Sequence, residues 1–145
     1  MSVELSVGVI AAVALGGAAG AASRFLLDKY LRAGVLIANT LGCLLLGVLI
    51  GAAAAMAAAA SAGGRVTVSS GFAYGGTSAW EPWTVGLLAF GLVGALSTFA
   101  TVSLRAAQLW THRRRWAALG LWGLHCGFGI TAAAGGLALG WALAV

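Results

Sequence analysis

Charged side chains are scarce in this chain, and their scarcity excludes a water-soluble domain. Only 8% of the 145 residues are charged, 61% are hydrophobic, and the mean hydropathy is +1.01. A soluble domain carries roughly 25% charged residues, which it needs to cover its water-facing surface. The length allows a single domain, which we place at residues 1–145. The composition therefore predicts a protein that lies in a membrane.

Proline and cysteine are also rare. Proline occurs once and cysteine twice, whereas glycine occurs 23 times. Few helix breakers and many small residues suit closely packed membrane helices. Both cysteines, Cys43 and Cys126, lie in apolar runs, and a disulfide framework or metal site needs more ligands than these and two histidines. No nucleophile, base and orienting group occur together, so the sequence also predicts that the protein is no enzyme.

Four apolar runs are long enough to cross a bilayer, which takes about 20 residues. They cover residues 5–27, 33–60, 84–110 and 116–143, and the second and fourth are long enough to tilt or protrude. Residues 61–82, between the second and third runs, are rich in Gly, Ser and Thr and indicate a loop. The sequence thus predicts an all-α integral membrane protein with four transmembrane helices.

Basic residues are distributed unequally between the two sides of such a protein. One side, which carries the links 28–32 and 111–115, has seven Lys or Arg: Arg24, Lys29, Arg32, Arg105, Arg113, Arg114 and Arg115. The other side has only Arg65. The positive-inside rule places the basic side in the cytoplasm and both termini outside. Nucleic-acid binding is the rival interpretation of the net charge of +5, but arginines beside a span are more typical of membrane anchors, so we expect no nucleic-acid partner.

The third apolar run contains an unusual polar stretch, GLVGALSTFATVS, at residues 91–103. It carries five hydroxyl or aromatic side chains: Ser97, Thr98, Phe99, Thr101 and Ser103. A helix that only spans the bilayer would consist of Leu, Ile, Val and Ala. Polar groups at that depth are costly, and they usually line a path or meet a partner. This stretch therefore points to permeation.

Three segments share the order and spacing of the helix patterns of a known family. They are GGAAGAASRF at 16–25, GVLIANTLGCLLLG at 34–47, and GALSTFATVS at 94–103, which is similar to G-x-x-T-T-F-S-T-F-S. Together they resemble the small bacterial fluoride channels called Fluc or CrcB, and the resemblance covers most of the chain. The fourth run, 116–143, matches only in general character.

This resemblance implies a specific architecture and function. The family fold is a dimer of four-helix subunits packed antiparallel in the cell membrane of bacteria, with a break in the third helix. Two fluoride pathways lie along the subunit interface, and a central sodium ion (Na+) is structural and is not transported. The implied function is passive export of fluoride that entered the cell as neutral HF.

The resemblance also assigns residues to the fluoride pathway. Asn39 matches the pathway asparagine and can offer two N–H donors to a small anion, although Asn also joins membrane helices by hydrogen bonds. Phe99 matches the first pathway phenylalanine, whose electropositive ring edge can face an anion; simple packing is the alternative. Three hydroxyls either line the pathway or bond to helix carbonyls, those of Thr98, Thr101 and Ser103.

Three further residues match the family outside the pathway proper. Arg24 matches the arginine at the end of the first helix, where it would attract anions into a vestibule or act as an interfacial anchor. Gly94 and Ser97 fall on the break in the third helix, where freed backbone carbonyls would hold the sodium ion. The alternative for these two residues is a face of small side chains for helix packing.

The chain departs from the family at two positions. Val102 stands where the second pathway phenylalanine is expected, and Arg105 stands near a position that is often acidic. The charge bias predicts insertion in one orientation only, whereas antiparallel homodimers need both. We therefore expect a heterodimer with an oppositely oriented homologous subunit, while a homodimer remains open.

Two other function classes fit the sequence less well. A small multidrug-type exporter needs a carboxylate inside the membrane to exchange protons, and the three acids, Glu4, Asp28 and Glu81, lie at or outside the ends of the spans. A non-transporting assembly or scaffold protein would explain the Gly and Ala content, but not Asn39 together with the polar stretch of the third run.

Overall fold

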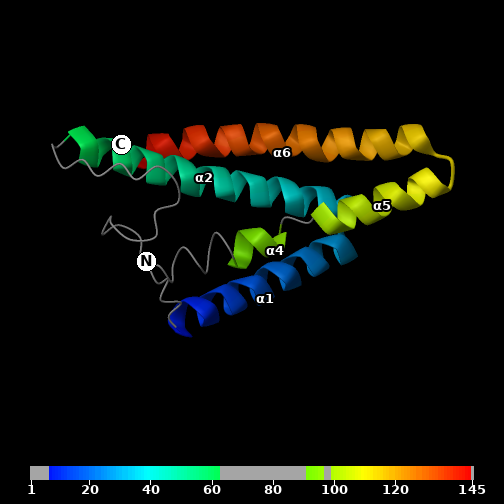
Figure 1. Cartoon of the computed structure of the whole chain (residues 1–145), viewed down its shortest axis with the longest axis horizontal. Helices are drawn as coiled ribbons and strands as arrows, with labels where there is room; N and C mark the ends of the chain where they lie inside the picture. The colour runs from blue at the N-terminus through cyan, green and yellow to red at the C-terminus, as the bar shows by residue number, and fades with distance from the viewer. Residues whose placement is uncertain (1–6, 63–90, 97–98, 145) are drawn as a thin grey trace, which may run out of the picture.

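The computed structural model describes residues 7–62, 91–96 and 99–144, and the regular structure there is helical (Figure 1). The helices are α1 (Val7–Tyr30), α2 (Gly34–Ala62), α4 (Gly94–Leu96), α5 (Phe99–Thr111) and α6 (Arg115–Ala144). A π-helical turn at 91–93 leads into α4. Four segments are long and apolar enough to span a membrane: Val7–Tyr30, Gly34–Met56, Gly91–Thr111 and Arg115–Ala144. The predicted all-α fold with four membrane-spanning helices is confirmed.

Some sequence predictions differ from the structure at the ends of helices or fall outside the described residues. Helix α2 continues through residues 61 and 62, which the sequence assigned to the loop, because the Ala-rich run before them propagates the helix. Helix α1 runs to Tyr30, so the first link is a turn closed by the bond from the Leu31 N–H to the Leu27 carbonyl. The rest of the loop, the start of the third run, and Ser97 and Thr98 lie outside the described residues. The break in the third helix therefore stays a prediction.

The long helices alternate in direction. Helices α1 and α5 run one way, and α2 and α6 run the other way and lie side by side (Figure 1). The turn after α1 and the hairpin between α5 and α6 consequently lie toward the same end of the molecule (Figure 1). Every Lys and Arg of the described residues lies within two turns of this end: Arg24, Lys29, Arg32, Arg105, Arg113, Arg114 and Arg115. The remaining length of each span is uncharged.

Glycines bring α2 and α6 into backbone contact. A Cβ atom on Gly47 would overlap the carbonyl oxygen of Ala133, and one on Gly136 would overlap that of Leu44. The same relation repeats one turn further along both helices, at Gly51 and Gly140. Small residues four apart on both partners let membrane helices approach closely, since lipid supplies no hydrophobic force between them. The α2–α6 pair is the most closely packed part of the described chain.

Helix α1 holds the segment that precedes α5 in the same way. A Cβ atom on Gly20 would overlap the carbonyl oxygen of Leu92, and one on Gly91 would lie 2.8 Å from the Cα atom of Gly16. The π-helical turn therefore rests directly on the α1 backbone. This contact fixes where the third span crosses α1, and with it the entry to α5.

Candidate anion pathway

Asn39 lies at the contact between α2 and α6. It is half-buried, and its Nδ2 atom lies 3.5 Å from the position that a Cβ atom on Gly129 would take. The Cys43 sulfur lies 3.3 Å from the same position. Glycine at 129 therefore leaves room beside the amide, in an uncharged part of both helices, where an N–H donor meets little competition from water.

Phe99 projects from the start of α5. Its side chain is 71% exposed, and its ring meets the edge of Trp122 on α6 with centroids 5.3 Å apart and an interplanar angle of 69°. This T-shaped contact fixes the ring while most of its surface stays open. An exposed aromatic on a membrane helix faces either lipid or a second subunit.

One face of helix α6 contacts both Phe99 and Asn39. Trp122, His125 and Gly129 are spaced by three and four residues, so they lie on one helix face. Seven residues of helix separate the Phe99 contact from the Asn39 contact, a rise of about 10 Å. Between them lies His125, whose side chain is only 8% exposed.

His125 has a defined ring orientation and an open nitrogen. Its Nδ1 atom lies 2.9 Å from the Leu121 carbonyl oxygen, and because a carbonyl only accepts, Nδ1 carries the hydrogen. Its Nε2 atom is buried and has no hydrogen-bond partner among the described residues. From the sequence, His125 could line a route, but the pattern gives no register for the fourth run. Its spacing to Trp122 and Gly129 was visible, but nothing in the sequence showed that this face meets Asn39 and Phe99.

Ser103 is the second buried polar group without a partner in the described chain. Its Oγ atom is buried, and the residue lines the same groove between α5 and α6 as Trp122. A buried polar atom left unpaired costs about 1–3 kcal/mol, so such atoms in a native protein mark a missing water, ion or partner. Ser103 and His125 thus place two unused polar atoms on the helices that carry Phe99 and the face toward Asn39.

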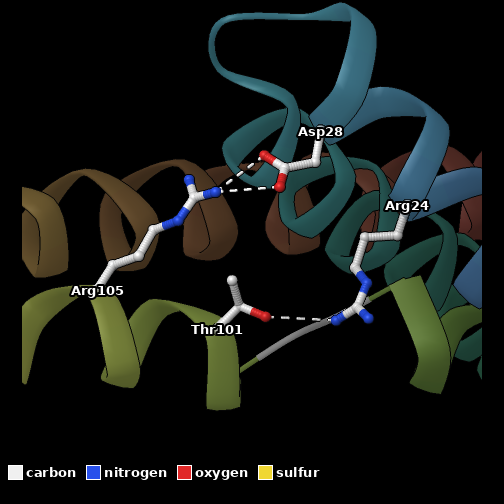
Figure 2. Close-up of polar contacts among 4 residues, drawn as sticks. All are labelled: Arg24, Asp28, Thr101 and Arg105. Carbon is white, nitrogen blue, oxygen red and sulfur yellow. Dashed lines mark hydrogen bonds and ion pairs between the residues drawn. The ribbon is translucent and has the colours of Figure 1, made fainter.

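Two contacts join α1 to α5 at the basic end (Figure 2). The Arg24 guanidinium donates a long hydrogen bond of 3.4 Å to the Thr101 hydroxyl oxygen. The Arg105 Nη2 atom lies 3.0 and 3.1 Å from the two carboxylate oxygens of Asp28. Both contacts join residues 77 positions apart, as expected for parallel helices in register. Thr101 is therefore half-buried beside a cation, and Arg24 is held toward the third span.

The structure describes only part of the remaining predicted site. Gly94 lies in α4 and is exposed, whereas Ser97 and Thr98 lie outside the described residues. No group of three or more His, Cys, Asp or Glu converges in the described ranges. A cation bound in that part of the chain would have to be held by backbone, hydroxyl or amide oxygens.

A protein-family model covers most of the chain. Residues 11–137 match the family model described as CrcB-like protein, Camphor Resistance (CrcB). The chain belongs to the CrcB family. This is the Fluc/CrcB family of fluoride channels, whose members are membrane channels and not enzymes. No curated protein matches the chain at a significant level. The CrcB chain is accordingly a multi-pass membrane protein with a general role as a fluoride channel.

The two departures from the CrcB pattern have structural explanations. Val102 is only 4% exposed, so this position packs inside the subunit and contributes nothing to the surface from which Phe99 projects. Arg105, which inverts the usual sign, meets Asp28 of α1. The inverted charge is therefore balanced within the chain.

We expect the Arg105–Asp28 pair to contribute modestly to stability. The two side chains are 45% and 41% exposed, and exposed ion pairs contribute about 0.2–1 kcal/mol. A double-mutant cycle of Asp28→Asn and Arg105→Gln, read as the free energy of unfolding in detergent, should give a coupling in that range. The matched cycle of Asp28→Asn with Arg32→Gln, for which no ion pair is seen, should give a coupling near zero. Equal couplings in the two cycles would contradict a specific pair.

Proposed function

We propose that this chain is a subunit of a fluoride-selective channel through which cytoplasmic fluoride leaves the cell passively. One observation carries the proposal beyond family membership. The α6 face that carries Trp122, His125 and Gly129 meets both Phe99 and Asn39, so an aromatic ring and an amide lie along one helix face. Neutral N–H and O–H donors and a ring edge, spaced along one face, are what a dehydrated anion needs along its route.

The proposed pathway binds fluoride with neutral groups. The Asn39 amide supplies N–H donors, the hydroxyls of Thr98, Thr101 and Ser103 supply O–H donors, and the Phe99 ring edge supplies a weak positive potential. The described basic residues lie toward one end of the bundle, so the described part of the chain places no fixed cation along the rest of the route. Conduction requires binding that is weak enough for release, and neutral donors meet that requirement.

Arg24 acts at the end of this pathway. A cation at the mouth of a narrow route raises the local anion concentration without trapping the ion deep inside. Its bond to Thr101 keeps the guanidinium beside the third span and away from bulk lipid. We assign Arg24 to the cytoplasmic vestibule.

The structural sodium ion would be held by backbone carbonyls of Gly94 and Ser97. Sodium prefers hard oxygen ligands, and the described residues offer no carboxylate cluster that would favour a divalent ion instead. Gly94 fits such a role because it is exposed and has no side chain to cover its carbonyl. When bound, the positive ion would attract backbone carbonyls from the third spans of both subunits and so stabilise the contact between them.

The channel would be a dimer with the second subunit inserted in the opposite orientation. The concentration of the described basic residues at one end supports one insertion direction for this chain. We place that end, with the links 28–32 and 111–115, in the cytoplasm of a bacterial cell and both termini outside. A heterodimer with an oppositely biased homologous subunit satisfies this orientation, and the partner would supply the second pathway ring that this chain does not have.

Efflux from liposomes loaded with potassium fluoride tests the proposal. The purified chain alone, and the chain with a homologous subunit of opposite charge bias, are reconstituted separately and assayed for fluoride and chloride. We expect fluoride efflux without chloride efflux in the two-subunit sample and weak or no efflux from the chain alone. Full efflux activity of the chain alone would support the channel function and contradict the requirement for a second kind of subunit. Silence of both samples would leave a non-transporting assembly protein as the function.

A further inference from the structure

The hairpin between α5 and α6 is the most basic segment of the described chain. His112, Arg113, Arg114 and Arg115 follow one another there, and all four are exposed. The stretch from Phe99 to Ala144 contains no acidic residue, and Asp28, the one acid in the described residues, is engaged by Arg105. The described residues therefore offer no free carboxylate as a counter-charge for these arginines.

The hairpin backbone does not explain why arginine stands at its centre. The Arg113 N–H bonds to the Trp110 carbonyl and the Arg114 N–H bonds to the Leu109 carbonyl, which is the pattern of a Schellman motif. Arg113 occupies its left-handed position with φ 61°. Glycine is the usual residue there, since a left-handed conformation disfavours residues with a Cβ atom. The turn would form more easily without this arginine, which points to a use for its charge.

An apolar groove of about 330 Å³ opens beside the hairpin, between α5 and α6. Its walls include Ala106, Ala107, Trp110, Ala118, Leu119 and Trp122. The Arg115 guanidinium lies over the Trp110 ring, 5.3 Å from its centroid, so a cation stands at the mouth of the groove. Trp110 and Trp116 are 51% and 86% exposed, as expected where a helix meets the lipid headgroups.

We propose that this hairpin and groove form a binding site for an anionic phospholipid. The phosphate and the anionic headgroup would bind Arg113, Arg114 and Arg115, and one acyl chain would lie in the groove over Ala107. Basic clusters directly beside a membrane span attract anionic lipid, and the apolar groove adds a contact that a free phosphate could not make. The site sits at the end of the third and fourth spans and adjoins the proposed fluoride pathway, because Ser103 and Trp122 also line this groove.

Native mass spectrometry of the purified chain in detergent, with equal amounts of phosphatidylglycerol and phosphatidylcholine, tests the site. We expect the wild-type chain to retain phosphatidylglycerol preferentially. Arg113→Gly with Arg114→Gln should lower that retention about tenfold, without loss of thermal stability, since glycine suits the turn. The matched double variant Lys29→Gln with Arg32→Gln removes the same charge at the same end and should retain the lipid as the wild type does.

The groove is tested separately from the charge. Ala107→Phe should fill the groove and reduce phosphatidylglycerol retention, whereas Ala134→Phe, on an exposed part of α6 outside the groove, should not. Glycerol phosphate, which has no acyl chain, should fail to compete. Equal retention of the two lipids by the wild type, equal loss in the Lys29 and Arg32 control, or full competition by glycerol phosphate would each overturn the lipid site.

Discussion

Adding a single methyl group to Gly136 is expected to weaken the whole bundle. In Gly136→Ala the new Cβ atom meets the Leu44 carbonyl oxygen and lies 3.0 Å from the Val48 backbone nitrogen. Both are backbone atoms of α2, so the clash cannot be relieved by rotating a side chain, and the two helices must separate. Overpacking of this kind costs about 1–3 kcal/mol. Thermal unfolding in detergent should show a lower midpoint, and SDS titration should show a lower free energy of unfolding.

The adjacent glycine is the control for this prediction. A Cβ atom on Gly135 has nothing within 4 Å, so Gly135→Ala adds the same methyl group to the same turn of α6 without contact. Alanine favours a helix over glycine by up to about 1 kcal/mol. Gly135→Ala should therefore be neutral or stabilising. If the two variants unfold alike, the glycine contact between α2 and α6 does not hold the bundle together.

The fold was predictable because membrane solvation leaves few choices. Four apolar runs with almost no charge can only be helices when backbone groups must be satisfied internally. The glycine contacts were less visible, since 23 glycines offer many four-residue spacings. Gly135 and Gly136 are neighbours in sequence, yet only Gly136 meets another backbone. Helix rotation, which the sequence pattern did not fix, decides between them.

The candidate site was predictable only in part, for a similar reason. The family pattern pointed to Asn39 and Phe99, which stand in segments with distinctive residues. His125 stands in a segment of general apolar character. Only its position between Trp122, which meets Phe99, and Gly129, which lies beside Asn39, makes it a candidate site residue. Arg105, in contrast, stood out in the sequence as an inverted charge, but its partner did not. That partner, Asp28, lies 77 positions earlier in the chain. The same separation of 77 positions joins Arg24 to Thr101. Because α1 and α5 run in the same direction, one geometric relation explains both side-chain contacts.

Replacing Asn39 with aspartate is expected to abolish fluoride efflux in whichever assembly conducts, the chain alone or the two-subunit channel. An ionised carboxylate in the uncharged part of α2 would repel fluoride by about 4 kcal/mol at 4 Å and an effective dielectric constant of 20. A protonated carboxyl would offer one donor in place of the two N–H donors of the amide. Efflux should fall at least about a hundredfold. The fluoride electrode assay in liposomes measures it directly.

Two further comparisons separate a pathway role of Asn39 from a role in helix packing. Thr40 is the next residue, but its hydroxyl bonds to the Leu36 carbonyl of its own helix at 2.8 Å, so Thr40→Val should leave efflux near the wild-type rate. Gly129→Ala places a methyl group 3.3 Å from the Cys43 sulfur and 3.5 Å from the Asn39 Nδ2 atom. Gly127→Ala meets nothing within 4 Å. The first should slow efflux by filling the space beside the amide, and the second should not. Since all four variants can be checked for intact assembly by gel filtration, unchanged efflux in Asn39→Asp and Gly129→Ala would remove Asn39 from the route and leave it as a contact between α2 and α6.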